Sequence, residues 1–170
     1  YIRTDLPAII EKNNVSFFYR NGYSTSPAIF EVFYNAEKET WAVNPIATTV
    51  TPDSFVVALD KNNITWLLYK PSTPEIYALN KTGENWGQSS FLFSGRQNSA
   101  LGSLSFLSNN KPVLFTTFVN STLLAYSNSD LKDTPVKRDL VLSPYYFNSS
   151  IVKTNSTWLN RIAYTPYSGS

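Results

Sequence analysis

The feature that most constrains the fold is a stretch of sequence that the chain repeats. Residues 58–66 read Ala-Leu-Asp-Lys-Asn-Asn-Ile-Thr-Trp, and residues 9–17, which lie 49 positions earlier, read Ile-Ile-Glu-Lys-Asn-Asn-Val-Ser-Phe. Looser copies follow at residues 106–113 and 151–158. Each copy has an apolar run, an Asn-rich turn and a second apolar run, which is the pattern of a β-hairpin. Asparagine tolerates the left-handed backbone of such turns, so hairpins that recur about every 45 residues predict a repeat architecture.

Further short apolar runs follow each of the first three hairpins and are typical of strands. In the first repeat they lie at residues 28–34 and 41–44, and in the second at residues 75–79 and around Trp86. Four strands in about 45 residues is the size of a β-propeller blade. We therefore predict one all-β domain over residues 1–170, a partial β-propeller of about three and a half four-stranded blades. The repeats are expected at approximately residues 6–50, 51–99, 100–142 and 143–170, the last of them incomplete.

A β-sandwich is the alternative fold, because the spacing of the strands fits it as well. The 49-residue self-similarity favours the propeller. Three and a half blades do not close a ring, and an open arc would leave strand edges uncovered. We therefore expect a second chain, or the remainder of a cleaved parent, to complete the propeller. The sequence has no Met, even at position 1, which favours a processed piece, and Lys137-Arg138 is either a processing site or an exposed charged loop.

Charge and missing residue types exclude several classes of function. The net charge is +2, only 15% of the residues are charged and no basic run occurs, so nucleic-acid binding is not expected. There is no Cys and no His, which removes disulfides, thiol catalysis, the usual zinc ligands and a His general base. We predict no metal and no cofactor. No apolar run approaches the roughly 20 residues of a membrane span, so none is expected.

Six N-x-[ST] sequons favour a secreted glycoprotein, located outside the cell or at the cell surface. The sequon asparagines are Asn14, Asn63, Asn80, Asn120, Asn148 and Asn155. Chance in a chain rich in Asn, Ser and Thr is the competing explanation. Asn14 and Asn63 occupy the same place in two copies of the repeat, at the hairpin turn, where a glycan would face solvent.

The acidic residues do not predict an enzyme. A glycosidase needs two facing carboxyl groups about 5 to 9.5 Å apart. Glu31 and Glu75 are the only acids inside predicted strands, they belong to different repeats, and nothing in the sequence places them together. A Gly-rich phosphate loop and a Gly-x-Ser-x-Gly motif are both absent.

Aromatic side chains beside polar groups favour sugar binding, because an aromatic ring can stack on a sugar while polar groups bind its hydroxyls. In repeat length, in turn–strand pattern and in residues 30–35 (Phe-Glu-Val-Phe-Tyr-Asn) followed by Thr40-Trp41, the chain resembles the fungal fucose-specific lectin family. The resemblance implies a six-bladed propeller with sugar sites between blades, each built from an Arg, a Glu and an aromatic residue. Glu31 and Trp41 match the Glu and the aromatic residue.

The resemblance departs from that family at the arginine. Val15 or Ser16 stands at its place in the first repeat, and Ile64 or Thr65 in the second. The candidate sugar-binding residues are Glu31, Trp41, Glu75, Tyr77 and Trp86.

The sequence is consistent with two functions. The first is a secreted, lectin-like propeller whose blades bind glycans. The second is a structural or protein-interaction propeller subunit with no sugar site, in which the aromatic residues pack between blades.

Overall fold

A computed structural model describes residues 7–11, 14–21, 29–95, 97–107, 109–118, 123–127, 136–140, 144–154 and 157–166. All regular secondary structure in these ranges is β-strand, which confirms the all-β prediction for this part of the chain. The described residues contain no helix, and therefore none that could span a membrane.

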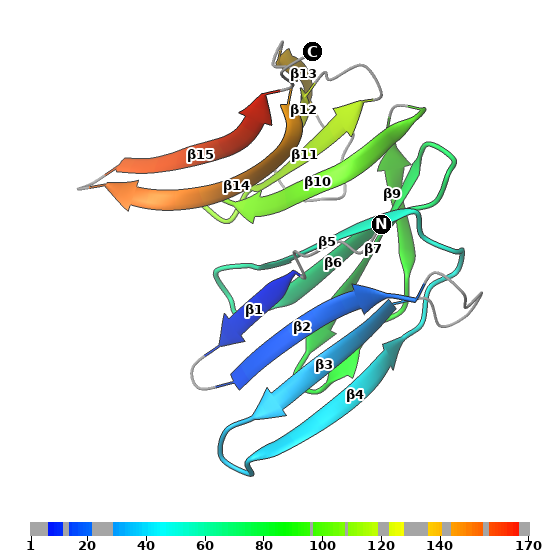
Figure 1. The fold of residues 1–170 in the computed structure, drawn as a ribbon, viewed down its shortest axis with the longest axis vertical. Coiled ribbons are helices and arrows are strands. Elements are labelled where there is room, and N and C mark those ends of the chain that lie inside the picture. Colours follow the sequence, from blue (N-terminus) through cyan, green and yellow to red (C-terminus); the bar gives the residue numbers. More distant parts are fainter. Residues whose placement is uncertain are drawn as a thin grey trace.

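Within these ranges the strands form four antiparallel sheets (Figure 1). The first sheet has β1 (Ala8–Glu11), β2 (Asn14–Arg20), β3 (Ile29–Asn35) and β4 (Thr40–Ile46). The second has β5 (Ser54–Leu59), β6 (Thr65–Lys70), β7 (Glu75–Thr82) and β8 (Asn85–Trp86), and β9 (Ser90–Ser94) also pairs with β7. The third has β10 (Ser99–Phe106), β11 (Pro112–Phe118), β12 (Leu123–Ser127) and β13 (Val136–Leu140). The fourth has β14 (Pro144–Thr154) and β15 (Thr157–Pro166).

Successive sheets meet through their first strands. β5 contacts both β1 and β10, and β10 contacts β14 (Figure 1). The sheets therefore follow one another in chain order, with the first and the fourth at opposite ends. The described residues do not form a closed ring, so the number of blades and the boundaries of the repeats stay predictions.

Two hydrophobic clusters hold the first three sheets together. One contains Phe18 and Ile29 of the first sheet with Leu67 and Tyr69 of β6, and the other joins Leu68 of β6 to the third sheet. Successive side chains of a strand point to opposite faces, so β6 is buried on both sides. This position explains its nearly continuous apolar sequence, because a strand that is covered on both faces needs apolar residues at every position.

The repeated stretch owes its composition to the turn between β5 and β6. Asp60 Oδ1 accepts hydrogen bonds from the backbone N–H groups of Asn62 (2.8 Å) and Ile64 (2.9 Å), and Asn63 has a φ of 58°. Asp60 Oδ2 accepts from Trp66 Nε1 at 3.2 Å. The acid, the second asparagine and the tryptophan of the stretch thus each have a defined role in one turn.

The turn between β10 and β11 repeats the same backbone pattern. The N–H of Leu107 donates to the carbonyl of Lys111, as the N–H of Asp60 donates to that of Ile64. Asn110 has a φ of 62°, and its Oδ1 accepts from the backbone N–H of Lys61 at 3.0 Å. Neighbouring turns are therefore bonded to each other across the boundary between the second and third sheets.

The first hairpin departs from this pattern. Glu11 pairs directly with Asn14, so Asn14 begins β2, whereas Asn63 lies inside the longer turn between β5 and β6. The two asparagines therefore do not hold the same structural position, contrary to their alignment in the sequence. Phe17 and Trp66 also align in the sequence, but Phe17 faces away from the second sheet and Trp66 faces the third. A one-residue shift in strand register is enough to exchange the two faces of a strand.

Substitution of Asp60 tests the role of the turn. Asp60→Ala removes the acceptor for two backbone N–H groups and for the indole of Trp66, so we expect a loss of about 2–4 kcal/mol in the free energy of unfolding. The matched control is Asp53→Ala. Asp53 is exposed and pairs with exposed Arg20 at 3.9 Å, an ion pair worth at most about 1 kcal/mol. Urea unfolding of both variants measures the difference, and equal losses would contradict this role of Asp60.

Candidate functional site

The candidate site is centred on a buried carboxylate in the middle of β3. Ile29 and Glu31 face the second sheet, while Phe30 and Val32, on either side of Glu31, face the other way. Glu31 is only 1% exposed. It pairs with Phe18 of β2 and with Asn44 of β4, so it lies in the interior of the first sheet. A charge at such a position is costly unless it is paired and hydrogen-bonded.

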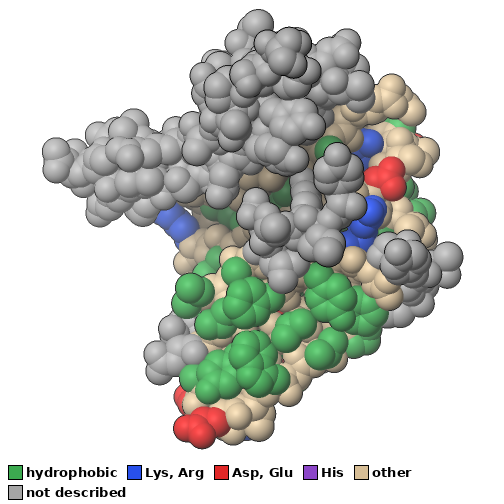
Figure 2. Space-filling model, viewed as in Figure 1, with side chains coloured by type: hydrophobic (Ala, Val, Ile, Leu, Met, Phe, Trp, Pro, Cys, Tyr) green, Lys and Arg blue, Asp and Glu red, His purple; other side chains and the backbone are tan. Residues whose placement is uncertain are grey.

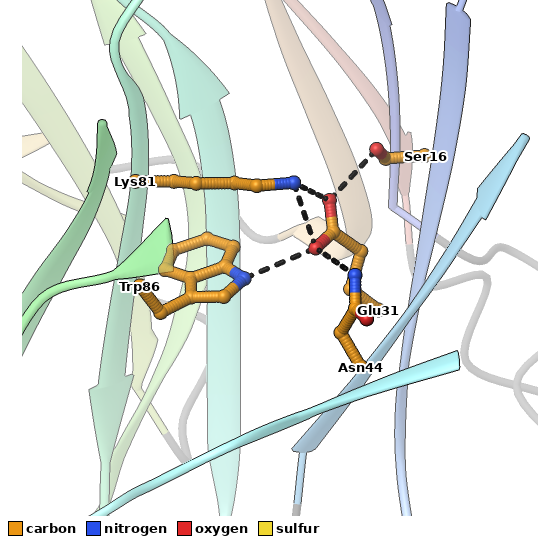
Figure 3. Close-up of polar contacts among 5 residues, drawn as sticks. All are labelled: Ser16, Glu31, Asn44, Lys81 and Trp86. Carbon is orange, nitrogen blue, oxygen red and sulfur yellow. Dashed lines mark hydrogen bonds and ion pairs between the residues drawn. The ribbon is translucent and has the colours of Figure 1, made fainter. Parts of the chain in front are cut away.

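Four side chains supply five hydrogen bonds to the Glu31 carboxylate (Figure 3). Lys81 Nζ donates to both oxygens, at 2.7 Å to Oε1 and 2.9 Å to Oε2. Ser16 Oγ donates to Oε1 at 2.8 Å, while Trp86 Nε1 and Asn44 Nδ2 donate to Oε2 at 3.1 and 3.3 Å. Ser16 and Asn44 belong to the first sheet, and Lys81 and Trp86 to the second. The carboxylate therefore joins the two sheets through polar groups.

The surroundings of Glu31 keep it ionised. Burial alone would raise the pKa of the carboxyl group, but the hydrogen bonds and the positive charge of Lys81 oppose this effect. The hydrogen bonds from Ser16 and Trp86 act in the same direction as Lys81, and the pKa of Glu31 is lowered from its ordinary value of 4.5.

Two aromatic rings lie beside the ion pair. The ammonium group of Lys81 lies 5.0 Å from the centre of the Phe33 ring, close enough for a cation–π interaction. The indole of Trp86 packs edge-on against Phe18, with 6.0 Å between ring centres and 88° between ring planes. The same tryptophan thus contributes to the core and donates to the carboxylate, which fixes the position of its N–H.

A cleft of about 600 Å³ lies between the first and second sheets, with the ion pair of Glu31 and Lys81 among its lining residues. Most of the other lining groups are amides and hydroxyls, contributed by both sheets and the turns beside them. They include Asn14, Asn35, Thr40, Asn44, Thr65 and Asn85. Lys38 and Glu84 add one charge of each sign, while Ile9, Phe33 and Ala42 add apolar surface.

The structure brings two of the five candidate sugar-binding residues together. Glu31 and Trp86 are hydrogen-bonded at 3.1 Å. Trp41 lies on the opposite face of the first sheet, 59% exposed, with its ring 4.8 Å from that of Tyr34. Its neighbour in β4, Ala42, lines the cleft instead. The predicted combination of Glu31 and Trp41 in one site is therefore not what the geometry gives.

The other two candidates lie away from Glu31. Tyr77 stacks on Tyr69, with 5.3 Å between ring centres, and meets the edge of Phe91. Glu75 begins β7, and a hydrogen bond from Thr73 lowers the pKa of its carboxyl group. Neither residue is among those that line the cleft.

The sequence analysis missed Lys81, which replaces the expected arginine as the cation beside Glu31, and it missed Asn44. Ser16 was noted only as a mismatch at the position of that arginine. One signal for Lys81 was available, because an acid inside an apolar strand needs a cation and β7 carries one at its end. Spacing along the chain does not show which sheet supplies it.

Two of the sequon asparagines line the cleft. Asn14 Oδ1 accepts a hydrogen bond from the backbone N–H of Ala36 at 3.2 Å, and Asn63 is exposed. Asn80 is half-buried in β7. Asn120 and Asn155 lie outside the described residues, and the side chain of Asn148 in β14 is not described. Glycosylation of all six stays a prediction.

Comparison with known proteins shows a likeness of fold and does not show a function. No protein-family model matches the chain, and no curated protein matches it. The chain is similar in structure to a bifunctional GH43-CE protein of Bacteroides eggerthii, with a TM-score of 0.59 and 12% identity. That alignment covers 91% of this chain and 22% of the other, so the chain spans less than a quarter of the larger protein.

The chain is also similar to a bacterial fucose lectin, from Kordia zhangzhouensis, whose structure was solved in complex with methyl-fucoside. The TM-score is 0.51 and the identity 10%, over 79% of this chain and 97% of the lectin. Identities this low show a likeness of fold alone. The similarity is to a bacterial lectin, and membership of the fungal lectin family stays a prediction.

Removal of the charge of Glu31 should destabilise the fold in a pH-dependent way. We expect Glu31→Gln to lower the free energy of unfolding at pH 7 by about 3 kcal/mol, the lower end of the range for breaking a buried ion pair. The pKa of Glu31 is lower in the folded chain than its ordinary value of 4.5, so its stabilisation is fully present above that value. The difference from wild type should shrink as the pH falls through the folded pKa.

The measurement is urea unfolding between pH 3 and pH 7. Glu84→Gln is the matched control, because Glu84 lines the same cleft but is exposed, and a change within about 0.5 kcal/mol is expected there. A Glu31→Gln variant as stable as Glu84→Gln at pH 7 would show that the buried carboxylate does not hold the two sheets together.

Proposed function

We propose that this chain is a carbohydrate-binding protein that takes a neutral sugar in the cleft between the first and second sheets. The observation that carries the proposal is the lining of this cleft, in which amide and hydroxyl groups surround an ion pair already held in place by both sheets. Pockets that bind small ligands combine a preformed cavity with a few fixed polar groups.

The balance of charge in the cleft favours a neutral ligand. Glu31 is neutralised by Lys81, and Lys38 is offset by Glu84, so no net charge of either sign is available for an acidic or basic ligand. Amides and hydroxyls both donate and accept hydrogen bonds, as sugar hydroxyls do. Phe33, Ile9 and Ala42 offer apolar surface for the C–H groups of a sugar ring.

The fold comparison supports a sugar as the ligand class. One of the similar structures is a fucose lectin, and fucose is a neutral sugar, so a methyl fucoside is the first compound to test. We further propose that the four sheets are blades of a propeller, which fits their order along the chain and the contacts between their first strands.

The state of Glu31 supports binding rather than hydrolysis. A general acid in a glycosidase needs a raised pKa, whereas the pKa of Glu31 is lowered. Both oxygens of Glu31 already accept hydrogen bonds from Lys81, and other protein groups add further ones. The carboxylate therefore suits a fixed support for the cleft better than a group that exchanges protons with a substrate.

We also propose that the protein is an extracellular glycoprotein, on the basis of its six sequons. A glycan on Asn14 or Asn63 would stand at the cleft, because both residues line it. Binding experiments therefore require protein without N-glycans as well as glycosylated material.

A second candidate function is a structural or interaction subunit with no sugar site. The observation that favours it is that five hydrogen bonds from four side chains already satisfy both carboxylate oxygens of Glu31. In that case the ion pair holds the sheets together and the cleft has no ligand.

Blocking the cleft distinguishes the two functions. Ala42 is exposed and lines the cleft, so Ala42→Arg should fill it without disturbing the core. We expect binding of neutral methyl glycosides, including methyl fucoside, to weaken more than tenfold in calorimetric titrations. Ala47→Arg makes the same change at an exposed alanine that does not line the cleft, and its binding should match wild type.

The experiment uses protein produced without N-glycans, with thermal unfolding as a check on the fold. Wild-type protein that binds no glycan on a broad array would rule out the carbohydrate-binding function and favour the structural one. Equal binding by the Ala42→Arg and Ala47→Arg variants would place the sugar site elsewhere.

A further inference from the structure

The face of the first sheet that points away from the second sheet is apolar throughout. It is formed by the odd-numbered residues 15–19 of β2, the even-numbered residues 30–34 of β3 and the odd-numbered residues 41–45 of β4. We call it the outer face. Its members pair across the strands, Phe17 with Val32 and Tyr34 with Trp41, so they form one continuous surface. Figure 2 shows hydrophobic side chains gathered over this sheet.

The aromatic residues of the outer face are ordered against one another. Trp41 contacts both Tyr34 and Phe17, with ring centres 4.8 and 6.4 Å apart, and Tyr19 stacks on Phe30 at 5.2 Å. Trp41 is nevertheless 59% exposed and Val43 58% exposed. Continuous apolar patches larger than a few hundred Å² are rare on soluble monomers and mark interaction sites.

In the second sheet, the face that corresponds to the outer face is covered by another sheet. Trp86 lies on the face of the second sheet that the first sheet covers, where it packs against Phe18 and donates to Glu31. Trp41 follows Asn35 at the same spacing as Trp86 follows Asn80. Trp41 lies on the outer face, which is the corresponding face of the first sheet. The outer face therefore corresponds to a surface that, one repeat later, is buried under another sheet.

We propose that a second copy of this chain covers the outer face. Inside the chain, the first sheet packs on the second and the second on the third, so the chain already contains sheets suited to covering one another. The outer face stands at one end of this series, and the sheet of β14 and β15 stands at the other (Figure 1). Two copies related by a twofold axis would bring each outer face against the far end of the other copy.

The area available fits this arrangement. The strands β2, β3 and β4 have 7 residues each, and at about 4.8 Å between strands and about 3.4 Å per residue they present a flat area of roughly 340 Å². The strands β14 and β15, with 11 and 10 residues, present roughly 340 Å² as well. A stable interface buries about 800 Å² per partner. One contact between two outer faces falls well short of this value, whereas a twofold pair with two junctions supplies roughly 700 Å² per copy, within the range of about 600–1,000 Å² per partner for specific interfaces.

Sedimentation velocity on the wild-type chain is the first test, and a dimer of twice the 19.2 kDa chain mass is expected. Trp41→Glu places a charge in the outer face and should weaken dimerisation at least tenfold. Phe91→Glu is the matched control, because Phe91 is 57% exposed but lies on β9 of the second sheet, and it should remain dimeric. Circular dichroism and thermal unfolding report whether each variant folds.

A labelling experiment keeps the proposal testable if Trp41→Glu does not fold. The chain has no cysteine, so Val43→Cys and Phe91→Cys each introduce a single thiol. Maleimide should react with the Val43→Cys thiol at least tenfold more slowly than with the Phe91→Cys thiol in the dimer, and dilution should abolish the difference. A wild-type monomer at tens of micromolar, a dimer unaffected by Trp41→Glu, or equal labelling of the two thiols would each overturn the proposal.

Discussion

The arrangement of the first two sheets depends on one buried carboxylate. Glu31 is 1% exposed and ionised, and it is tolerable only because Lys81 and Trp86 of the second sheet reach it, together with Ser16 and Asn44 of the first. Apolar burial is not directional, so it specifies the relative position of two sheets less sharply than hydrogen bonds do. The three hydrogen bonds that Lys81 and Trp86 of the second sheet donate to this carboxylate fix the relative position of the two sheets. The polar cleft between the sheets therefore has a rigid support.

The two faces of each strand have separate roles in this molecule. In the first sheet one face carries Glu31 and the residues that line the cleft, while the other carries only apolar and aromatic side chains. In the second sheet both faces are covered, so β6 is apolar at successive positions and Tyr69 and Leu68 belong to different clusters. Ligand binding and association between chains would thus use opposite faces of the first sheet. A substitution that weakens ligand binding therefore need not weaken association, and the reverse also holds.

The sequence predicts where the strands lie along the chain better than it predicts which side chains meet between neighbouring sheets. Alternating apolar residues and Asn-rich turns give the all-β fold and the hairpins, and Glu31 and Trp86 were both among the candidate residues. What the sequence does not show is register. The turn between β5 and β6 is longer than the one between β1 and β2, so Phe17 and Trp66 align in the sequence but face opposite ways. Lys81 was missed for a related reason, since the partner of a buried acid lies in the next sheet and spacing within one repeat cannot identify it.

A double-mutant cycle on Glu31 and Lys81 measures the interaction between the sheets most directly. Urea unfolding of Glu31→Gln, Lys81→Met and the double variant gives the coupling free energy between the two side chains. The cycle subtracts the contributions that each residue makes through its other contacts. Each single change leaves a buried polar or charged group without its partner, whereas the double change removes both charges. We expect a coupling of at least about 2 kcal/mol, with the double variant more stable than the sum of the single losses predicts. Losses that add to within about 0.5 kcal/mol would contradict the claim that this ion pair holds the two sheets in place.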